Sequence, residues 1–282
     1  MVTDSEHRIS DICAEWRAEG LSVGFVPTMG AFHRGHLSLV EIAVASSDRV
    51  VVSIFVNPMQ FGPDEDLDRY PRNLEKDCKS VEELGASVVF TPRTDVVYPD
   101  GFSTGVYVAG MSEGLCGAAR PGHFDGVTTV CAVLFGIVRP DLAVFGMKDA
   151  QQLAVIRRMV SDLRMGIDIV AAPIVREFDG LAMSSRNQYL SVEEREQACF
   201  ISIGLEMALV LFRMGERNCE VLRNAFLSKL EDAPLLKVQY VETVDPDTML
   251  GVEQVEKQVL LAVAVFAGKT RLIDNILIEL EV

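Results

Sequence analysis

Three features of common protein classes are missing from this chain of 282 residues. Its six cysteines are scattered without a C-x-x-C pair, which argues against a zinc site and against a disulfide scaffold. Basic residues are in deficit, because 26 Lys and Arg stand against 41 Asp and Glu, for a formal net charge of −15. A chain this acidic is poorly suited to the phosphate backbone of a nucleic acid, so we expect no nucleic-acid partner.

Long apolar runs are missing as well. No stretch approaches the roughly 18 consecutive apolar residues of a membrane span. Residues 1–8 (MVTDSEHR) lack the basic-then-apolar order of a signal peptide. Hydrophobic residues still make up 49% of the chain, which is enough for a sizeable core. These absences predict a soluble, cytoplasmic protein with no membrane partner.

Strand-like and helical patterns alternate through the first 175 residues. The alternation is interrupted at residues 92–121, where periodicity is lost and a long loop is expected. Five strands alternating with helices predict an open parallel sheet of the Rossmann-like α/β class, whose ligands sit beyond the carboxyl ends of the strands. The strands are expected at 23–26, 50–55, 88–91, 142–145 and 168–171, and the helices at 5–19, 37–46, 74–84, 127–138 and 149–163.

The pattern changes after Pro173. The sequence Ser191-x-x-Glu194 is a capping box and predicts the start of a long helix, with another helix at 219–230. Three strand-like runs follow, at 238–243, 259–266 and 271–280. We therefore expect two domains, a Rossmann-like domain at 1–175 and a smaller α+β domain at 176–282.

The stretch at residues 23–40 predicts a strand, a turn and a helix. His33 and His36 are three residues apart, so a helix that begins near Gly35 would project both rings at its N-terminus, where free N–H groups and the helix dipole favour anions. Two imidazoles beside an anion site indicate catalysis on phosphates, although a solvated turn would have the same spacing. His-x-Gly-His after a strand resembles the HIGH signature of the nucleotidyltransferase superfamily.

Polar residues follow other expected strands. Asn57 and Gln60 come after the run at 50–55, and Lys148 and Asp149 after the run at 142–145. Because loops at the carboxyl ends of parallel strands converge, these residues and the two histidines should line one crevice. Lysine suits a phosphate, and the neutral amides of Gln60 and Gln152 suit hydroxyl and carboxylate groups. Asp149 fits either a helix N-cap or an acceptor for a ribose hydroxyl.

A polar segment at residues 183–186 (MSSR) follows an expected turn at 178–180. Its hydroxyls and guanidinium suit triphosphate oxygens. A surface turn with an exposed Arg186 is the simpler reading of this segment taken alone.

Six motifs occur in order across most of the first 190 residues: PTMGAFHRGH, NPMQFG, YPR, RPGHFDGV, FGMKDAQQL and MSSRNQYLS. In this combination the chain resembles the pantothenate synthetase (pantoate–β-alanine ligase) family. The resemblance implies that ATP and (R)-pantoate form pantoyl adenylate and pyrophosphate, and that β-alanine then attacks to give pantothenate and AMP. It also implies Mg²⁺, a homodimer, and a C-terminal domain that acts as a lid.

The resemblance also implies residue roles. His36 would be the acid of the site and His33 its partner on the phosphates, while Lys148 and Arg186 would neutralise the triphosphate. Mg²⁺ would be held largely by the phosphates, so no protein metal ligand is expected. The expected ATP-binding residues are Pro27, Met29, Gly30, Ala31, Phe32, His33, Arg34, Gly35, His36, Gly146, Met147, Lys148, Asp149, Val175, Met183, Ser184, Ser185 and Arg186.

Pantoate would be held by Gln60 and Gln152, with Asn57 beside them. The chain departs from the family pattern at Ala150, where KDYQQ is usual, and at Asp125, where Arg or a small residue is common. Two other functions stay open at this level. One is a nucleotidyltransferase that moves AMP or CMP to a phosphorylated small molecule, which leaves the two glutamines unexplained; the other is a non-catalytic ATP-binding sensor.

Overall fold

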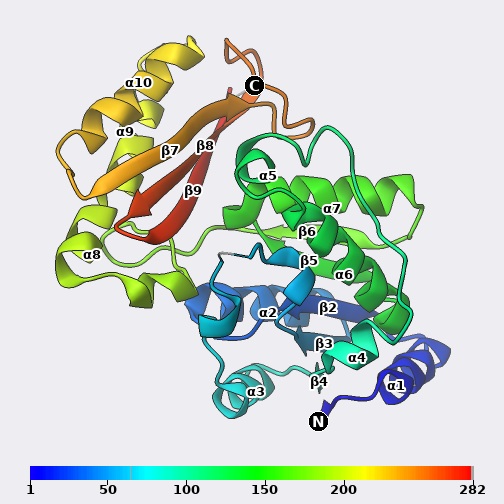
Figure 1. The fold of residues 1–282 in the computed structure, drawn as a ribbon. Coiled ribbons are helices and arrows are strands. Elements are labelled where there is room, and N and C mark those ends of the chain that lie inside the picture. The colour runs from blue at the N-terminus through cyan, green and yellow to red at the C-terminus, as the bar shows by residue number, and fades with distance from the viewer. Residues whose placement is uncertain (64, 281–282) are drawn as a thin grey trace.

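A six-stranded sheet forms the first part of the computed structural model, which describes residues 1–63 and 65–280. Its strand order is β1-β4-β3-β2-β5-β6, and every neighbouring pair is parallel (Figure 1). The predicted α/β class and its five strands are confirmed, and a two-residue N-terminal strand, too short for a sequence pattern, is added. The strands are β1 (Val2–Thr3), β2 (Val23–Thr28), β3 (Arg49–Ile54), β4 (Val88–Phe90), β5 (Leu142–Gly146) and β6 (Asp168–Ala172).

The sheet grows in opposite directions on the two sides of β2. Strands β3 and β4 follow on one side, whereas β5 and β6 lie on the other. At such a switch point the loops after the two central strands diverge and leave a crevice at their carboxyl ends. The loop after β2 ends at His33, the first turn of the helix that follows carries His36, and the turn after β5 carries Lys148, so the topology alone brings these residues together.

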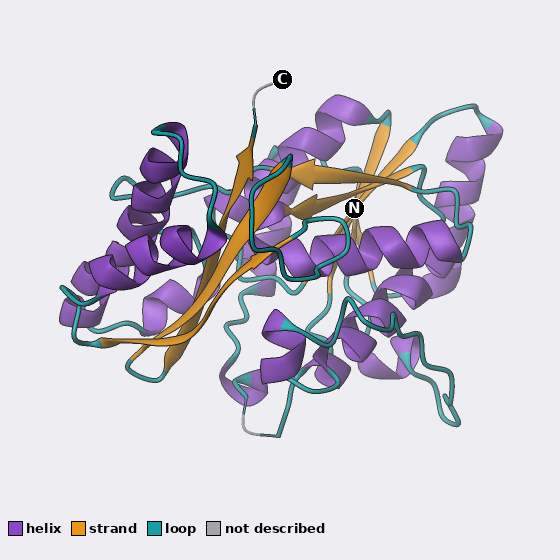
Figure 2. Ribbon diagram, turned by 90° about the horizontal axis from the view of Figure 1, so that it is seen from above, coloured by secondary structure: helices purple, strands orange, loops and turns teal. Residues whose placement is uncertain are grey.

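Helices cover both faces of this sheet (Figures 1 and 2). Val40 of α2 and Val81 of α3 pack on one face against Val26. On the other face, α1, α6 and α7 enclose Phe25 in the larger core cluster. This double covering explains the continuous apolar strands, which are buried on both sides. The helices are α1 (Glu6–Ala18), α2 (Arg34–Ser46), α3 (Leu74–Glu83), α4 (Thr94–Val97), α5 (Leu115–Ala119), α6 (His123–Val138) and α7 (Ala150–Asp162).

Four of these helices differ from the sequence prediction. α2 and α6 begin earlier than expected, at Arg34 and His123, and the stretch 92–121 contains α4 and α5. The earlier start of α2 puts His36 in its first turn. Among the described residues, no helix has the length and apolar character that crossing a bilayer requires.

The C-terminal part contains a second sheet. Strands β7 (Leu236–Val244), β8 (Gln258–Ala267) and β9 (Thr270–Glu279) pair antiparallel in that order. Leu261 packs with Leu205 and Phe226 of the covering helices into a separate core. The other side meets the first part of the molecule, where Leu260 and Ala154 share a small cluster. The covering helices are α8 (Val192–Ala198), α9 (Phe200–Arg213) and α10 (Cys219–Leu230), and the last two residues of the expected second domain, 281–282, lie outside the described range.

The capping box at the start of α8 is present, with both Ser191 and Glu194 hydrogen-bonded as predicted. The single long helix is a wrong prediction, because α8 ends at Ala198 and α9 begins after Cys199. The thiol of Cys199 donates to the Glu196 carbonyl at 2.9 Å. Such bonds from a side chain to the carbonyl one turn earlier compete with regular helical hydrogen bonds and accompany bends.

Helix α6 approaches the short 3-10 helix η1 (Pro58–Gln60) through Gly126. A Cβ atom at Gly126 would lie 2.4 Å from the carbonyl oxygen of Met59, which is far inside van der Waals contact. The Gly126 carbonyl also accepts a hydrogen bond of 3.1 Å from the Asn57 amide. Helix α6 therefore sets the position of the turn that carries Gln60.

We predict that Gly126→Ala lowers the free energy of unfolding by about 2 kcal/mol or more, because the backbone of η1 must shift to admit a methyl group. Thermal and urea unfolding would measure the change. The matched control is Gly136→Ala on the same helix, where a Cβ meets nothing within 4 Å. That variant should keep or gain stability by up to about 1 kcal/mol. Equal stabilities of the two variants would contradict the packing argument.

Candidate active site

Two joined cavities lie beyond the carboxyl ends of β2 and β5. The inner one, of about 220 Å³, is bounded by the histidine loop, η1 and the segment after β6. The outer one, of about 620 Å³, lies between the first part of the molecule and the β7–β9 sheet. Because they share part of their walls, they form one cleft. The residues that line both are Arg120, His123, Lys148, Asp149, Gln152, Ser184 and Arg186.

The cleft is locally basic although the chain is strongly acidic. The net charge of the chain is −15, yet basic side chains outnumber acidic ones along the outer cavity. A positive recess in a negative molecule favours small anions over extended polyanions. The basic residues are Arg69, Arg120, Lys148, Arg186, Lys269 and Arg271, and the acidic ones are Glu65, Asp66, Asp149 and Asp274.

The two histidines stack at the start of α2. His33 is the N-cap, and its Nδ1 accepts a hydrogen bond of 3.1 Å from the Gly35 amide. The ring centroids of His33 and His36 are 4.0 Å apart. Burial, then the charge of Lys148, lowers the pKa of His33 to about 4. Burial, then the neighbouring His33, lowers the pKa of His36 to about 3, so both rings are neutral at pH 7 and serve as hydrogen-bonding groups.

A buried carboxylate holds the turn that precedes the histidines. Asp77 of α3 accepts from the amide of Ala31 at 2.7 Å and from that of Phe32 at 2.9 Å. Gly30 has a φ of +79°, and a Cβ there would lie 2.9 Å from the Asp77 carboxylate. Sequence analysis missed Asp77, since an acidic residue in a helix has no distinguishing pattern. Arg34 points elsewhere and forms an exposed ion pair of 2.6 Å with Glu41.

The side chain of Gln60 is oriented by two neighbours on the inner cavity. Its amide Nε2 donates to Met29 Sδ at 3.1 Å, and its Oε1 accepts from Asn57 Nδ2 at 3.1 Å. Asn57 is 1% exposed, and its own oxygen accepts from the Tyr98 hydroxyl at 2.8 Å. Asn57 is therefore placed to orient Gln60 rather than to present free hydrogen-bonding groups to a ligand.

The turn after β5 is the 3-10 helix η3 (Met147–Asp149). Asn275 of β9 donates from Nδ2 to the carbonyls of Met147 and Lys148, at 2.9 and 3.0 Å, so the second sheet fixes this turn. Asp149 occupies the N-cap position of α7 without a side-chain capping bond and keeps its carboxylate in the cleft. Gln152 also lines both cavities.

The neighbouring Gln151 has a structural role. It is 6% exposed, and its Oε1 accepts from the Cys116 amide at 2.9 Å. Its Nε2 donates to the carbonyls of Met111 and Gly114 at 2.9 and 2.8 Å. The paired glutamines thus differ, because Gln151 anchors the glycine-rich loop at the outer cavity whereas Gln152 also lines the inner cavity.

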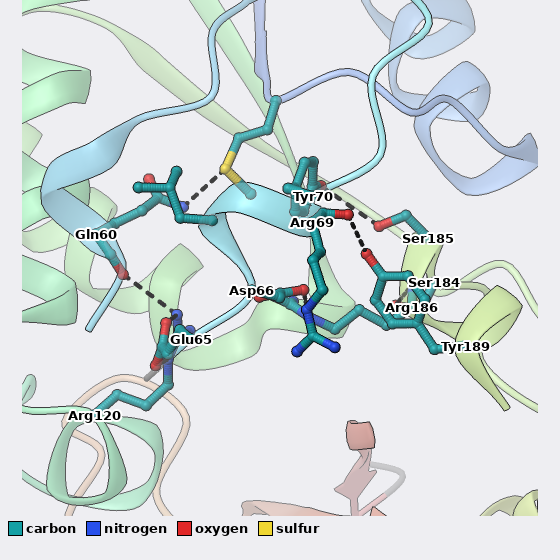
Figure 3. A network of polar contacts seen from close by, with 12 residues as sticks. Gln60, Glu65, Asp66, Arg69, Tyr70, Arg120, Ser184, Ser185, Arg186 and Tyr189 are labelled. Carbon is teal, nitrogen blue, oxygen red and sulfur yellow. Dashed lines mark hydrogen bonds and ion pairs between the residues drawn. The ribbon is translucent and has the colours of Figure 1, made fainter. Parts of the chain in front are cut away.

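Arg186 is held by a carboxylate of the loop after η1. Its Nε and Nη2 donate to Asp66 at 2.9 and 2.7 Å (Figure 3). Burial raises the pKa of Asp66, but the hydrogen bonds and charge of Arg186 outweigh it and keep that pKa below its usual range. Asp66 is thus ionised at neutral pH and occupies the guanidinium edge that a phosphate would use. Two further contacts join this loop to η4 (Ser185–Tyr189): Tyr70 Oη to Ser185 Oγ at 3.4 Å and Tyr189 Oη to the Arg69 carbonyl at 3.0 Å.

A second arginine is held in the same way, and sequence analysis gave it no role. Arg120 donates from Nε and Nη2 to Glu65 at 2.6 and 2.5 Å (Figure 3). Its Nη1 lies 3.0 Å from His123 Nε2, and His123 Nδ1 lies 2.8 Å from the Gln60 carbonyl. Nδ1 must therefore donate and Nε2 accept, which fixes the tautomer of His123. The motif RPGHFDGV contains both residues and was the signal that could have found them.

Most expected ATP-binding residues line the cleft. Val175 and Met183 come together because the Met183 amide donates to the Val175 carbonyl at 3.0 Å. Five expected residues line neither cavity: Gly30, Ala31, Phe32, Arg34 and Met147. The lining residues are Pro27, Met29, His33, Gly35, His36, Gly146, Lys148, Asp149, Val175, Met183, Ser184, Ser185 and Arg186.

Comparison with known proteins identifies a family for nearly the whole chain. Residues 1–277 match the family model described as pantoate-beta-alanine ligase. The pantothenate synthetase of Thermoanaerobacter pseudethanolicus is 53% identical over 277 residues, which cover 98% of each sequence. That of Caldicellulosiruptor saccharolyticus is 50% identical and covers 99% of each.

Solved structures agree with the sequence comparison. Pantothenate synthetase from Thermus thermophilus superposes with a TM-score of 0.91 at 42% identity, covering 98% of both chains. A pantoate-beta-alanine ligase from Francisella tularensis, complexed with beta-gamma ATP and beta-alanine, gives a TM-score of 0.81 at 33% identity and covers 98% of this chain and 97% of that one.

We predict that Asp77→Asn loosens the turn at residues 30–32, because an asparagine offers one acceptor where the carboxylate offers two. Loss of one charge-assisted bond should lower the free energy of unfolding by about 2 kcal/mol. Amide exchange at Ala31 and Phe32 should quicken. Glu75→Gln, an exposed change on the same helix, is the control and should stay within about 0.5 kcal/mol of the parent. Unchanged exchange in Asp77→Asn would refute the role of this carboxylate.

The stability of the protein should depend on pH through the two histidines. Their pKa values of about 4 and about 3 in the folded state lie below the ordinary 6.5, so the unfolded state binds more protons between these values. The free energy of unfolding should therefore fall as the pH is lowered from about 6.5 towards 4. Urea unfolding across this range would show a smaller fall in His36→Gln. Parallel curves for parent and variant would contradict the buried, neutral state of His36.

Proposed function

The chain belongs to the pantoate–β-alanine ligase family, and we propose that the cleft beyond β2 and β5 is the site where it carries out that family's reaction. It is an ATP-dependent ligase that condenses (R)-pantoate with β-alanine to form pantothenate. The observation that supports this site is the convergence of His33, His36 and Lys148 with Gln60 and Gln152 on one cleft. Family membership decides against the nucleotidyltransferase and sensor alternatives.

The first step joins pantoate to the α-phosphorus of ATP. A pantoate carboxylate oxygen forms the new bond to phosphorus while the bond to the β-phosphate oxygen breaks, giving pantoyl adenylate and pyrophosphate. No protein nucleophile is needed, so catalysis rests on position and on groups that meet the developing charge. We assign this task to Lys148 and to hydrogen bonds from the neutral rings of His33 and His36. In this assignment His36 donates a hydrogen bond to the phosphates.

Neutral amides suit the binding of pantoate. An arginine paired to its carboxylate would stabilise the nucleophile and slow its attack, whereas Gln60 and Gln152 can hold hydroxyl and carboxylate oxygens without a full charge. Gln60 is already oriented by Met29 and Asn57, so little ordering is left for the moment of binding. This arrangement assigns Asn57 to positioning Gln60.

The triphosphate is assigned to the Met183–Arg186 side of the cleft. Arg186 is bonded to Asp66, so a phosphate must share or displace that carboxylate. Ser184 caps η4 by accepting from the Arg186 amide at 3.2 Å, which orders the backbone beside the phosphates. Asp149 is assigned to the ribose hydroxyls.

We propose Mg²⁺ as the metal that accompanies ATP. No group of three or more His, Cys, Asp and Glu side chains suited to a metal ion occurs among residues 1–63 and 65–280. With no such group to surround it, the ion would be held mainly by phosphate oxygens and water. When bound, the ion neutralises phosphate charge.

We also propose an oligomeric state, a location and a division into domains. We infer a homodimer in the cytoplasm, as the family resemblance implies. We also infer a domain boundary near residue 175, with the second domain acting as a lid. The lid is supported by the position of the outer cavity between the two sheets, with the Asn275 bonds to η3 at its edge.

The reaction is tested by following its two halves. Protein, ATP, Mg²⁺ and pantoate should release pyrophosphate, and added β-alanine should then yield pantothenate and AMP. Removing Mg²⁺ with EDTA should stop the first half, since unshielded phosphate charge opposes the attacking carboxylate, and the second half then lacks the adenylate that it consumes. Pyrophosphate release is measured by a coupled assay. Turnover of ATP that does not require pantoate would overturn the assignment.

Two histidine variants, one inside the cleft and one outside it, test the role of His36. His36→Ala should lower kcat by on the order of 100-fold while the protein stays folded. His7→Ala removes a histidine from the exposed surface of α1 and should leave kcat unchanged. If His36→Ala keeps at least half of the parent activity, His36 has no role in the reaction.

A further inference from the structure

The Arg120–Glu65 pair stands where the two cavities meet, and no step derived above uses it. The side chain of Arg120 is 16% exposed and lines both cavities, while Glu65 lines the outer one. Nη2 of Arg120 also lies 3.3 Å from the main-chain carbonyl oxygen of Gln60, so this guanidinium adjoins the residue assigned to pantoate. A partly buried cation beside the main chain of Gln60 needs a reason beyond stability, since its only ion-pair partner in the described chain is a loop carboxylate.

The second substrate supplies that reason. β-Alanine carries a carboxylate two methylene groups from the amine that attacks the acyl carbon. Its carboxylate stays charged through the whole reaction, whereas that of pantoate becomes an acyl phosphate in the first step. A permanent guanidinium partner therefore helps the amino acid without weakening a nucleophile. The amine at the other end of β-alanine would then point towards the pantoyl group held by Gln60.

Building on the proposed function, we propose that Arg120 binds the carboxylate of the incoming β-alanine, and that Glu65 occupies this place until the amino acid arrives. Glu65 pairs through both oxygens with Nε and Nη2, which is the geometry that a substrate carboxylate would adopt. Glu65 lies between η1 and η2 (Leu67–Arg69), outside any helix or strand, so exchange does not break an element. Figure 3 shows this pair beside Gln60 and apart from Arg186.

The neighbours of Arg120 favour the amino acid over the other anions of the reaction. Arg120 contacts His123 and the Gln60 carbonyl, at the pantoate end of the cleft. Arg186 lies with Ser184 and Ser185, at the end assigned to the triphosphate. The two arginines, each held by its own loop carboxylate, would thus serve different substrates.

The experiment separates the two half-reactions. Hydroxylamine, a small nucleophile without a carboxylate, traps the acyl adenylate and reports the first half through pyrophosphate release. In Arg120→Gln this release should stay within about threefold of the parent, while KM for β-alanine rises by about 30-fold or more. Arg93→Gln, which removes an exposed arginine that pairs with Asp95 outside both cavities, is the matched control and should change neither value.

A second substrate distinguishes binding from a structural role. The parent should prefer β-alanine to β-alaninamide, which lacks the carboxylate, and Arg120→Gln should lose that preference. Arg120→Lys keeps a charge and should recover part of it. In Glu65→Gln, KM for β-alanine should fall because the competing carboxylate is gone.

Several results would overturn the inference. Equal losses with β-alanine, β-alaninamide and hydroxylamine would make Arg120 a structural residue. A rise in KM for pantoate or ATP in the hydroxylamine assay would assign it to the first step, and an unchanged preference for β-alanine in both Arg120 variants would leave it no role. If the parent protein releases no pyrophosphate with pantoate, the proposed function fails first, which is a separate outcome.

Discussion

The parallel pairing of β2 with both β3 and β5 is the constraint on which the site depends. Phe25 and Val26 are fully buried on opposite faces of this central strand, so its position is set by the core on both faces. Because β3 and β5 lie on opposite sides of β2, the loops that follow β2 and β5 leave the sheet in opposite directions and open a crevice between them at the carboxyl edge. The histidine loop and the Lys148 turn face each other for this reason, although more than 100 residues separate them.

The positive charges of the cleft are held in fixed positions, and two of them are neutralised by carboxylates. Lys148 and the neutral histidines are available to a phosphate, whereas Arg120 and Arg186 are each paired with a carboxylate of one loop. A buried guanidinium without a partner would be costly, and a pair that a substrate anion can replace avoids that cost while keeping the binding edge in place. Neighbouring residues Glu65 and Asp66 thus each hold one arginine of the cleft in place.

Support for the site comes largely from residues with no chemistry of their own in the reaction. Asp77 shapes the turn before the histidines, Asn57 orients Gln60, and Asn275 links the second sheet to the Lys148 turn. The bonds of Asp77 and Asn275 join segments distant in sequence, and that of Asn57 lies within one turn. Such bonds leave no periodic pattern, so they could not be predicted, and the same holds for the division of roles between Gln151 and Gln152.

The sequence by itself determined the strands, most of the helices and the residues at the carboxyl ends of β2, β3 and β5, because apolar periodicity and turn residues act over a few neighbours. Its ordered motifs also indicated the protein family. Only the tertiary structure decided that the helix after Ser191 breaks at Cys199, that Arg34 leaves the cleft, and that Glu65 and Asp66 hold two arginines. These outcomes depend on which charged and polar groups meet across the fold, and that is settled by packing between distant segments rather than by local pattern.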